Sequence, residues 1–140
     1  MPVPSPGPGE VLVAVGAAAI NNPDVNTRLG WYSKSVADAT ADLADAAARA
    51  VDDGGWSGQP FVFPRIQGTD VCGRIVAVGR GTDPARLGER VLVDPVLRPA
   101  DGSLAGVGYL GLERDGGFAE YTTVPAANAL RIDSVLTDVE

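Results

Sequence analysis

The 140-residue sequence predicts a mainly β fold, a small antiparallel and partly open barrel with short helices and one helical insertion. Two observations lead to this class. Side chains alternate with the period of two that half-buried strands require in 11–16 and again in 74–78. Clusters of turn-forming residues at 79–84, 98–102 and 114–117 divide much of the remaining chain into short strands.

The first predicted strand, 11–16, is followed by a helix start signal. Asn21 and Asn22 are candidate N-caps, Pro23 suits the first helical turn, and Asp24 is an acid that the helix dipole favours. We expect a helix of one or two turns that ends near Gly30. On this interpretation the asparagines serve only as caps, and Asp24 is a first-turn acid or a partner of a basic residue one turn later, at position 28.

The segment 33–60 carries its own helical pattern. Ser35 can cap a helix that places small apolar residues on one face and acids on the other, and Gly54–Gly55 can end it. This helix is either a solvated insertion or a lid over a substrate pocket. An aromatic group is expected to hold the insertion against the body, namely Trp56, Phe61 and Phe63.

Composition excludes several classes of partner. The formal charge is −7 and the isoelectric point is near 4.4, so the clustered Lys and Arg residues that nucleic acid or anionic membranes need are absent. The apolar stretch 11–20 is about half of the roughly 20 residues that span a bilayer. Residues 1–8 do not resemble a signal peptide, so a cytoplasmic protein is expected.

The chain has no histidine and one cysteine, Cys72. Catalysis by Ser-His-Asp or Cys-His groups is therefore excluded, as are zinc sites that use histidine. We interpret Cys72 as a small buried side chain, because no histidine can pair with its thiol. The segment 106–111 reads G-x-G-x-x-G, but no strand precedes it and no helix follows, so a glycine-rich loop is predicted in place of a nucleotide site.

Four motifs in fixed order resemble the medium-chain dehydrogenase/reductase family, which includes zinc alcohol dehydrogenases and quinone oxidoreductases. They are P-G-E-V-L-V at 8–13, the A-A-I-N-N-P-D turn at 18–24, G-T-D-x-x-G-x-I-V-x-V-G with L-G-E-R-V at 68–91, and G-G-F-A-E-Y at 116–121. The match is to the N-terminal, GroES-like catalytic domain of that family.

The resemblance implies a domain organisation. Residues 1–128 would form the GroES-like domain, incomplete at its N-terminus and interrupted by the 33–60 insertion. Residues 129–140 would begin a linker, helical from position 131, to a missing C-terminal nucleotide-binding domain. Loss of the first hairpin and of that domain would expose apolar surface and sheet edges and favour self-association.

The resemblance also implies an activity. The full-length parent would be an NAD(P)H-dependent oxidoreductase of the zinc-free branch, acting on a quinone, an enone or enal, or a simple carbonyl, while this fragment alone would bind no cofactor and be inactive. Zinc relatives carry His where this sequence has Thr69 and Cys where it has Asn21, and the four-cysteine structural zinc lobe is missing. No bound metal is therefore expected.

By the same resemblance, Asn21 and Tyr32 orient the substrate oxygen and donate hydrogen bonds to it. Asn22, Asp24, Thr69 and Asp70 would line the substrate pocket. The residues themselves leave an alternative for Asp70, which could hold backbone donors or an arginine. Two other functions stay open: a stand-alone GroES-like binding or assembly module without catalysis, and a metalloprotein of another kind.

Overall fold

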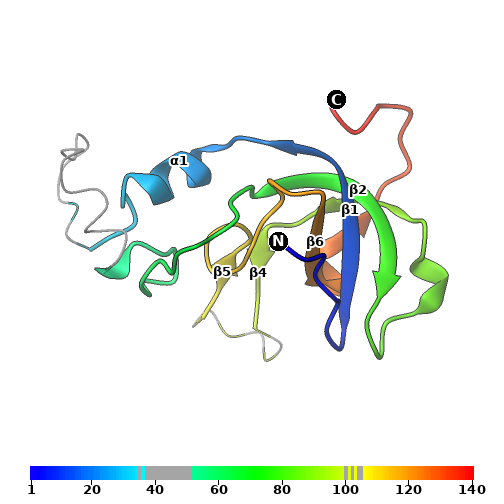
Figure 1. Ribbon diagram of the computed structural model, residues 1–140, viewed down its shortest axis with the longest axis horizontal. Coiled ribbons are helices and arrows are strands. Elements are labelled where there is room, and N and C mark those ends of the chain that lie inside the picture. The colour runs from blue at the N-terminus through cyan, green and yellow to red at the C-terminus, as the bar shows by residue number, and fades with distance from the viewer. Residues whose placement is uncertain (35, 37–51, 100, 102, 104–105) are drawn as a thin grey trace.

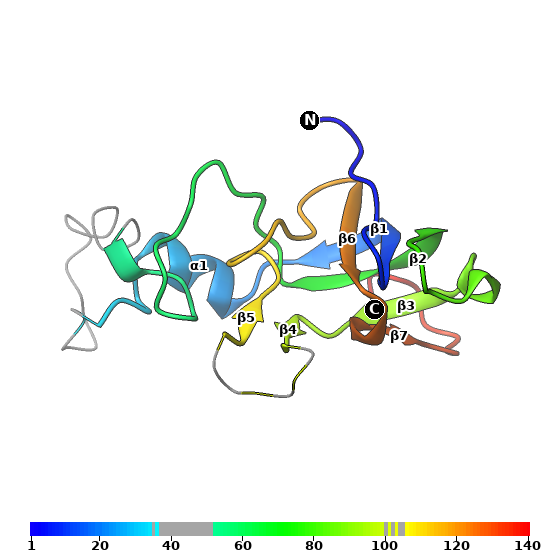
Figure 2. The same ribbon diagram turned by 90° about the horizontal axis from the view of Figure 1, so that it is seen from below.

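The chain folds around one curled, mainly antiparallel sheet (Figures 1 and 2). The computed structural model describes residues 1–34, 36, 52–99, 101, 103 and 106–140. In the five-stranded sheet the order is β6-β1-β2-β3-β7, and a second sheet pairs β4 with β5. The mainly β, partly open barrel that the sequence predicts is confirmed.

The elements within the described residues are the strands β1 (Glu10–Ala19), β2 (Asp70–Val78), β3 (Arg90–Val93), β4 (Val96–Leu97), β5 (Gly108–Tyr109), β6 (Tyr121–Pro125) and β7 (Ala129–Arg131), the helix α1 (Asn22–Arg28), and the short 3-10 helices η2 (Pro84–Arg86) and η3 (Ala126–Asn128). The helix predicted after Asn21 is thus confirmed as α1.

The core lies inside the curl of the sheet. Val11 and Val13 of β1 and Ile75 of β2 are at most 1% exposed, and they face inward because alternate residues of a strand point to the same side. The core cluster consists of Val11, Val13, Val71, Ile75, Val91, Val93, Leu110, Val124 and Ala129. Burial of this apolar surface is the main force that holds the curled sheet together.

Strands β1 and β2 determine where the candidate site lies. They pair antiparallel along most of their length, and the last residue of β1, Ala19, is opposite the first residue of β2, Asp70. The register shifts between Val15 and Ala17, so that Gly16 is the extra residue of a bulge. Residues that follow β1 therefore meet residues at the start of β2, although about fifty positions separate them in sequence.

The glycine motif at 116–118 packs directly on the backbone that precedes β2. The N–H groups of 116–118 donate to carbonyl oxygens of 66–68 over distances of 2.7–2.9 Å. Gly68 has a φ of +106°, and an added Cβ there would lie 2.6 Å from the Phe118 nitrogen. The two motifs thus form one unit that fixes the entry into β2.

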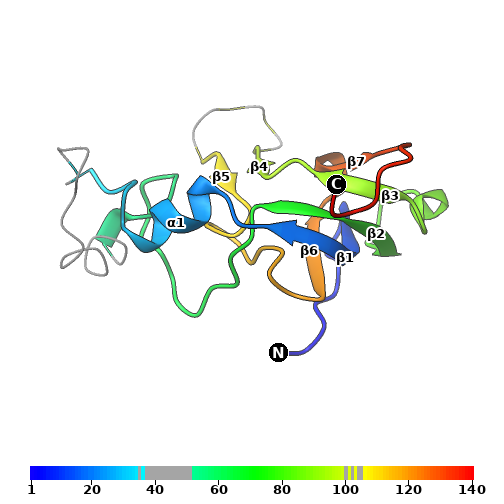
Figure 3. The same ribbon diagram turned by 90° about the horizontal axis from the view of Figure 1, so that it is seen from above.

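The C-terminal segment differs from the expectation of a helix beginning at position 131. Strand β7 pairs with β3, and the Ile132 N–H donates to the Arg90 carbonyl, so the chain stays extended along the sheet edge. Residues 133–140 then turn back over the outer face of the sheet without forming a helix (Figure 3). The linker helix predicted from the family resemblance is therefore wrong for these residues.

Two other expectations concern the segments 35–51 and 106–111. The helix expected after Ser35 falls on 35 and 37–51, which lie outside the described residues. The segment 106–111 contains only the two-residue strand β5, which is followed by a turn at 111–113. A turn in place of a helix after 111 agrees with the glycine-rich loop interpretation, while residues 104 and 105, which precede the motif, lie outside the described residues.

Candidate active site

Asn21 and Asp70 meet at the junction of β1, α1 and β2. Asn21 is the N-cap of α1, and its Oδ1 accepts the Asn22 N–H at 2.7 Å, as the cap interpretation predicts. The same side chain reaches across the sheet, where its Nδ2 donates to Asp70 Oδ2 at 2.8 Å. The Asn21 side chain is exposed, so its amide is accessible to a bound molecule.

Asp24 is buried, with 4% of its surface exposed, and both carboxylate oxygens accept backbone donors. Oδ2 accepts the Asn21 N–H at 3.0 Å and completes a capping box, while Oδ1 accepts the Gly68 N–H at 2.9 Å. The first-turn acid interpretation is confirmed. The alternative partner, Arg28, donates from Nε to Gln67 Oε1 at 2.6 Å. Asp24 therefore ties α1 to the entry of β2.

Thr69 lies between Gly68 and Asp70 and is 1% exposed. Within the described part of the chain its Oγ1 is buried without a hydrogen-bond partner. Buried polar groups in native proteins are nearly always paired, so such a hydroxyl calls for an explanation. A hydroxyl can both donate and accept, and Thr69 directly precedes Asp70 in the sequence.

Tyr32 belongs to a second group, an aromatic row beyond the end of α1. Its ring packs edge-on against Trp56 with centroids 5.1 Å apart, and Trp56 packs in the same way against Tyr109 of β5 at 5.0 Å. Trp56 thus contacts the body of the domain, as expected of an anchor. Burial raises the pKa of the Tyr32 phenol, with smaller contributions from Tyr109 and Asp24, so it keeps its proton at neutral pH.

Glu113 supports this aromatic row and was not singled out from the sequence. Its Oε2 accepts the Tyr109 N–H at 2.6 Å, and its Oε1 accepts the Ser57 N–H at 2.9 Å. One carboxylate therefore holds together the two backbone segments that carry Tyr109 and Trp56. An acid just before a D-G-G turn gives no sequence signal of this role, because the bonds join residues up to 56 positions apart.

A slot of about 290 Å³ opens beside Asp70. It is lined by residues 17–19 of β1, 70–72 of β2, Leu92 of β3 and the C-terminal residues 138–140. Cys72 is 8% exposed, its Sγ is 3.5 Å from Asp138 Oδ1, and burial raises the pKa of its thiol. A buried thiol of raised pKa is a poor nucleophile, in keeping with the structural interpretation.

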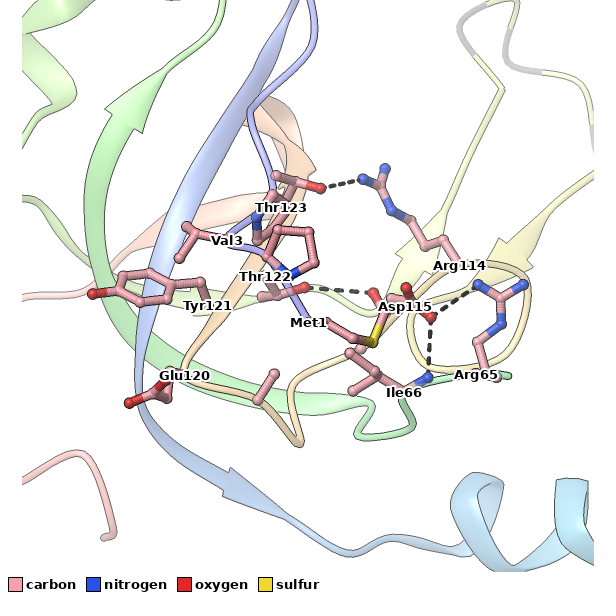
Figure 4. Close-up of a pocket in the computed structure, with 14 residues that line it drawn as sticks. Met1, Val3, Arg65, Ile66, Arg114, Asp115, Glu120, Tyr121, Thr122 and Thr123 are labelled. Carbon is pink, nitrogen blue, oxygen red and sulfur yellow. Dashed lines mark hydrogen bonds and ion pairs between the residues drawn. The ribbon is translucent and has the colours of Figure 1, made fainter. Parts of the chain in front are cut away.

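A larger cavity lies elsewhere, on the side of β6 (Figure 4). It measures about 650 Å³ and contains none of the predicted site residues. Its walls are joined through Asp115, whose Oδ1 accepts from Arg65 Nη1 at 3.2 Å and from the Ile66 N–H at 3.0 Å (Figure 4). The predicted site residues therefore lie away from this cavity, at the Asn21–Asp70 junction and in the aromatic row.

The junction offers donors and acceptors but a poor set of metal ligands. Its side chains are an amide, a hydroxyl and two carboxylates, from Asn21, Thr69, Asp24 and Asp70, and backbone N–H groups already occupy both oxygens of Asp24. Among the described residues no group of three or more acids and cysteines converges. Zinc in proteins prefers thiolate, imidazole and carboxylate ligands. The residues here suit the binding of a polar oxygen better than the binding of zinc.

Comparison with known proteins gives matches over nearly the whole chain. The family model described as the alcohol dehydrogenase GroES-like domain matches residues 7–134. The starvation-sensing protein RspB of Escherichia coli K12 is 33% identical over 97% of this chain and 35% of its own length. The chain thus spans about a third of the length of the curated relatives that it matches.

Solved structures show the same pattern. A Sinorhizobium meliloti 1021 protein described as an alcohol dehydrogenase has 45% identity and a TM-score of 0.75, over 98% of this chain and 36% of that one. An alcohol dehydrogenase of Escherichia coli CFT073 complexed with NADH has 32% identity and a TM-score of 0.67, over 97% of this chain and 34% of that one.

No helix in the described residues is long and apolar enough to cross a membrane.

Proposed function

Because the chain belongs to the family of alcohol dehydrogenase GroES-like domains, we propose that it is the substrate-side catalytic domain of an NAD(P)H-dependent oxidoreductase. The observation that carries this proposal is the exposed Asn21 amide that donates to Asp70 where β1, α1 and β2 meet. Among the described residues the buried hydroxyl of Thr69, the neighbour of Asp70 in sequence, has no hydrogen-bond partner. The cofactor would be held by a nucleotide-binding domain on the same longer polypeptide, because this chain has no nucleotide fingerprint of its own. When bound, a nicotinamide supplies or accepts a hydride.

We further propose that catalysis does not use zinc. The two positions at which zinc relatives carry His and Cys are Thr69 and Asn21. The Asn21 amide already donates to Asp70, and the second carboxylate, of Asp24, is buried and accepts two backbone N–H groups. The thiol of Cys72 contacts Asp138 and is buried. This donor set does not fit a catalytic zinc ion, so no step of the reaction is assigned to a metal.

Without a metal, charge that develops on a substrate oxygen must be stabilised by hydrogen-bond donors. The Asn21 amide has two N–H groups, of which one binds Asp70 and the other can donate to the substrate. The Asp70 bond fixes the orientation of the amide. The Thr69 hydroxyl would line the pocket from below its surface, since it is 1% exposed, and the Asn22 side chain, exposed at the first turn of α1, would lie at its rim.

The substrate class that fits such donors is an oxygen-bearing acceptor, which includes quinones, enones, enals and simple carbonyls. The names of the relatives favour the carbonyl or alcohol pair, since one of them is an L-galactonate-5-dehydrogenase and others are L-threonine 3-dehydrogenases. For this chain we therefore rank a carbonyl above a quinone.

The purified longer polypeptide provides the test. We expect it to oxidise NADH or NADPH with a carbonyl substrate, to contain substoichiometric zinc by elemental analysis, and to keep its turnover in the presence of a chelator. The 140-residue chain alone should bind neither nucleotide in a calorimetric titration. Stoichiometric zinc with loss of turnover on chelation would overturn the zinc-free mechanism. Absence of turnover with either nucleotide would favour the stand-alone binding module.

Replacing Tyr32 by Phe in the longer polypeptide should lower kcat about a hundredfold, at the low end of the range for a lost proton donor. The phenyl ring can still pack on Trp56, and of the contacts given for Tyr32 only the hydrogen bond with Asn26 is lost, so the thermal midpoint should fall slightly. Trp56→Phe is the matched control, because it alters the aromatic row and leaves the Tyr32 hydroxyl in place. Unchanged kcat in Tyr32→Phe would remove this residue from the chemistry.

A further inference from the structure

The C-terminal segment is held against the sheet by one carboxylate. Asp138 Oδ1 accepts from Arg90 Nε at 2.6 Å, and the Cys72 thiol donates to the same oxygen at 3.5 Å. The Arg90 and Asp138 side chains are only 14% and 28% exposed. Arg90 Nη1 also donates to the Ser134 carbonyl at 3.1 Å, so the guanidinium binds the C-terminal segment through two residues, Ser134 and Asp138.

The sheet is shaped to receive this carboxylate. Gly16 is the extra residue of the bulge in β1, next to the position that pairs with Cys72. A Cβ added at Gly16 would lie 2.0 Å from Asp138 Oδ2, so any other residue would displace the carboxylate. Gly16 does not have a positive φ, and the glycine is therefore explained by the space that Asp138 occupies.

Two positively charged side chains of the sheet independently favour a negatively charged group at the position of Asp138. Arg74 and Arg90 are direct cross-strand partners in β2 and β3, an arrangement that is unfavourable for two like charges. The hydrogen bond from Arg90 lowers the pKa of Asp138, with smaller contributions from Cys72 and Arg74. Asp138 is ionised at neutral pH and offsets the repulsion between the two guanidinium groups.

The segment that is held in this way borders the candidate site. Residues 138–140 line the slot that also contains Asp70, the partner of Asn21. In Figure 3 the same segment runs back from the end of β7 over β2 and β3. The position of Asp138 therefore sets how the chain leaves the domain beside the Asn21–Asp70 pair.

We propose that Gly16, Cys72, Arg74 and Arg90 form a binding site, here called the seat, for the Asp138 side chain. We call Asp138 and its seat together the latch, and we propose that the latch positions the polypeptide that would follow residue 140. Its consequence for catalysis rests on the proposed function, in which a nucleotide-binding domain follows on the same polypeptide. The latch would fix the attachment of that domain relative to Asn21 and so align the nicotinamide with the substrate oxygen.

Cys72 is the single cysteine of the chain and lies under the latch, so its alkylation rate by iodoacetamide reports opening. In Asp138→Asn and in Gly16→Ala the rate should rise by about tenfold to a hundredfold, the equilibrium factor of a hydrogen bond to a charged group. The rate is extrapolated to the fully ionised thiol from its pH dependence, which separates access from a change in pKa.

Asp133→Asn is the matched control, because Asp133 lies on the same segment, is exposed and is not part of the seat. Its alkylation rate should stay near that of the parent. Gly16→Ala keeps every charge, so agreement between the two latch variants excludes a purely electrostatic effect on the thiol. If both variants label at the rate of Asp133→Asn, the latch is overturned.

The positioning role is tested in the longer polypeptide. Asp138→Asn should lower kcat about tenfold through misalignment, while KM for the nucleotide stays unchanged because the nucleotide-binding domain still holds it. Faster labelling with an unchanged kcat would overturn the positioning role. A parent polypeptide without any turnover would count against the proposed function, and the labelling rates would still decide whether the latch exists.

Discussion

Substitution of Gly68 by alanine should destabilise the domain by about 4 kcal/mol or more, which is at the exceptional end for a single residue. Its φ of +106° is a conformation that residues with a Cβ adopt only under strain. The new Cβ would also lie 2.6 Å from the Phe118 nitrogen and 2.9 Å from the Gly117 nitrogen. These are backbone atoms, which cannot rotate away. Equilibrium urea denaturation of the 140-residue chain measures the change.

Gly81→Ala is the control that separates strain from collision. Gly81 has a φ of +84°, but no atom lies within 4 Å of the position that its Cβ would take. It should cost about 1–2 kcal/mol from conformational strain alone. Equal costs for the two variants would show that the packing of 116–118 on 66–68 contributes little, against the interpretation given above.

Local rules were sufficient for most of the fold. Alternation in β1 and β2 predicted strands whose inward residues, Val11, Val13 and Ile75, are buried. The N-cap at Asn21 and the acid at Asp24 predicted α1, because capping depends on residues within one turn. Each of these features is determined by neighbours in sequence, so it can be read without knowledge of the tertiary structure.

The C-terminal segment, residues 132–140, could not be predicted from neighbouring residues alone. The sequence after Arg131 was expected to be helical, but β7 pairs with β3 and the segment is then held by Asp138 on Arg90. The Arg90–Asp138 bond joins residues 48 positions apart and depends on the space left by Gly16 in a bulge. Nothing in the local sequence specifies either feature, and the expected helix came from the family resemblance, which carries no information about these contacts.

The roles of the candidate site residues stay predictions, and the structure shows which of these residues lie together. Asn21, Asp24, Thr69 and Asp70 gather at one junction because Ala19 and Asp70 are paired in the sheet register. Tyr32 instead lies in the aromatic row with Trp56, and the carboxylate that supports this row, Glu113, could not be found from sequence. Register and long-range hydrogen bonds decide both outcomes, so only the structure could reveal them.

Asn21→Asp in the longer polypeptide should lower kcat about a thousandfold while leaving the domain folded. Aspartate is as good an N-cap as asparagine, so the start of α1 is preserved. The variant loses both amide N–H groups, and with them the donor to Asp70 and the proposed donor to the substrate oxygen. Loss of one such donor typically costs a factor of about 100–1,000 in kcat, and the new carboxylate would add repulsion of the developing charge.

The double variant Asn21→Asp with Asp70→Asn sharpens this test. It restores an amide–carboxylate hydrogen bond between the two positions and removes the repulsion between neighbouring carboxylates, but the donor now belongs to position 70. If the amide at position 21 must face the substrate, kcat stays low although thermal stability returns to that of the parent. If Asn21 serves only as a helix cap, both variants keep the kcat of the parent, and the proposed role of its amide is excluded. The two readings differ in kcat and agree in stability, so measuring both quantities assigns the residue.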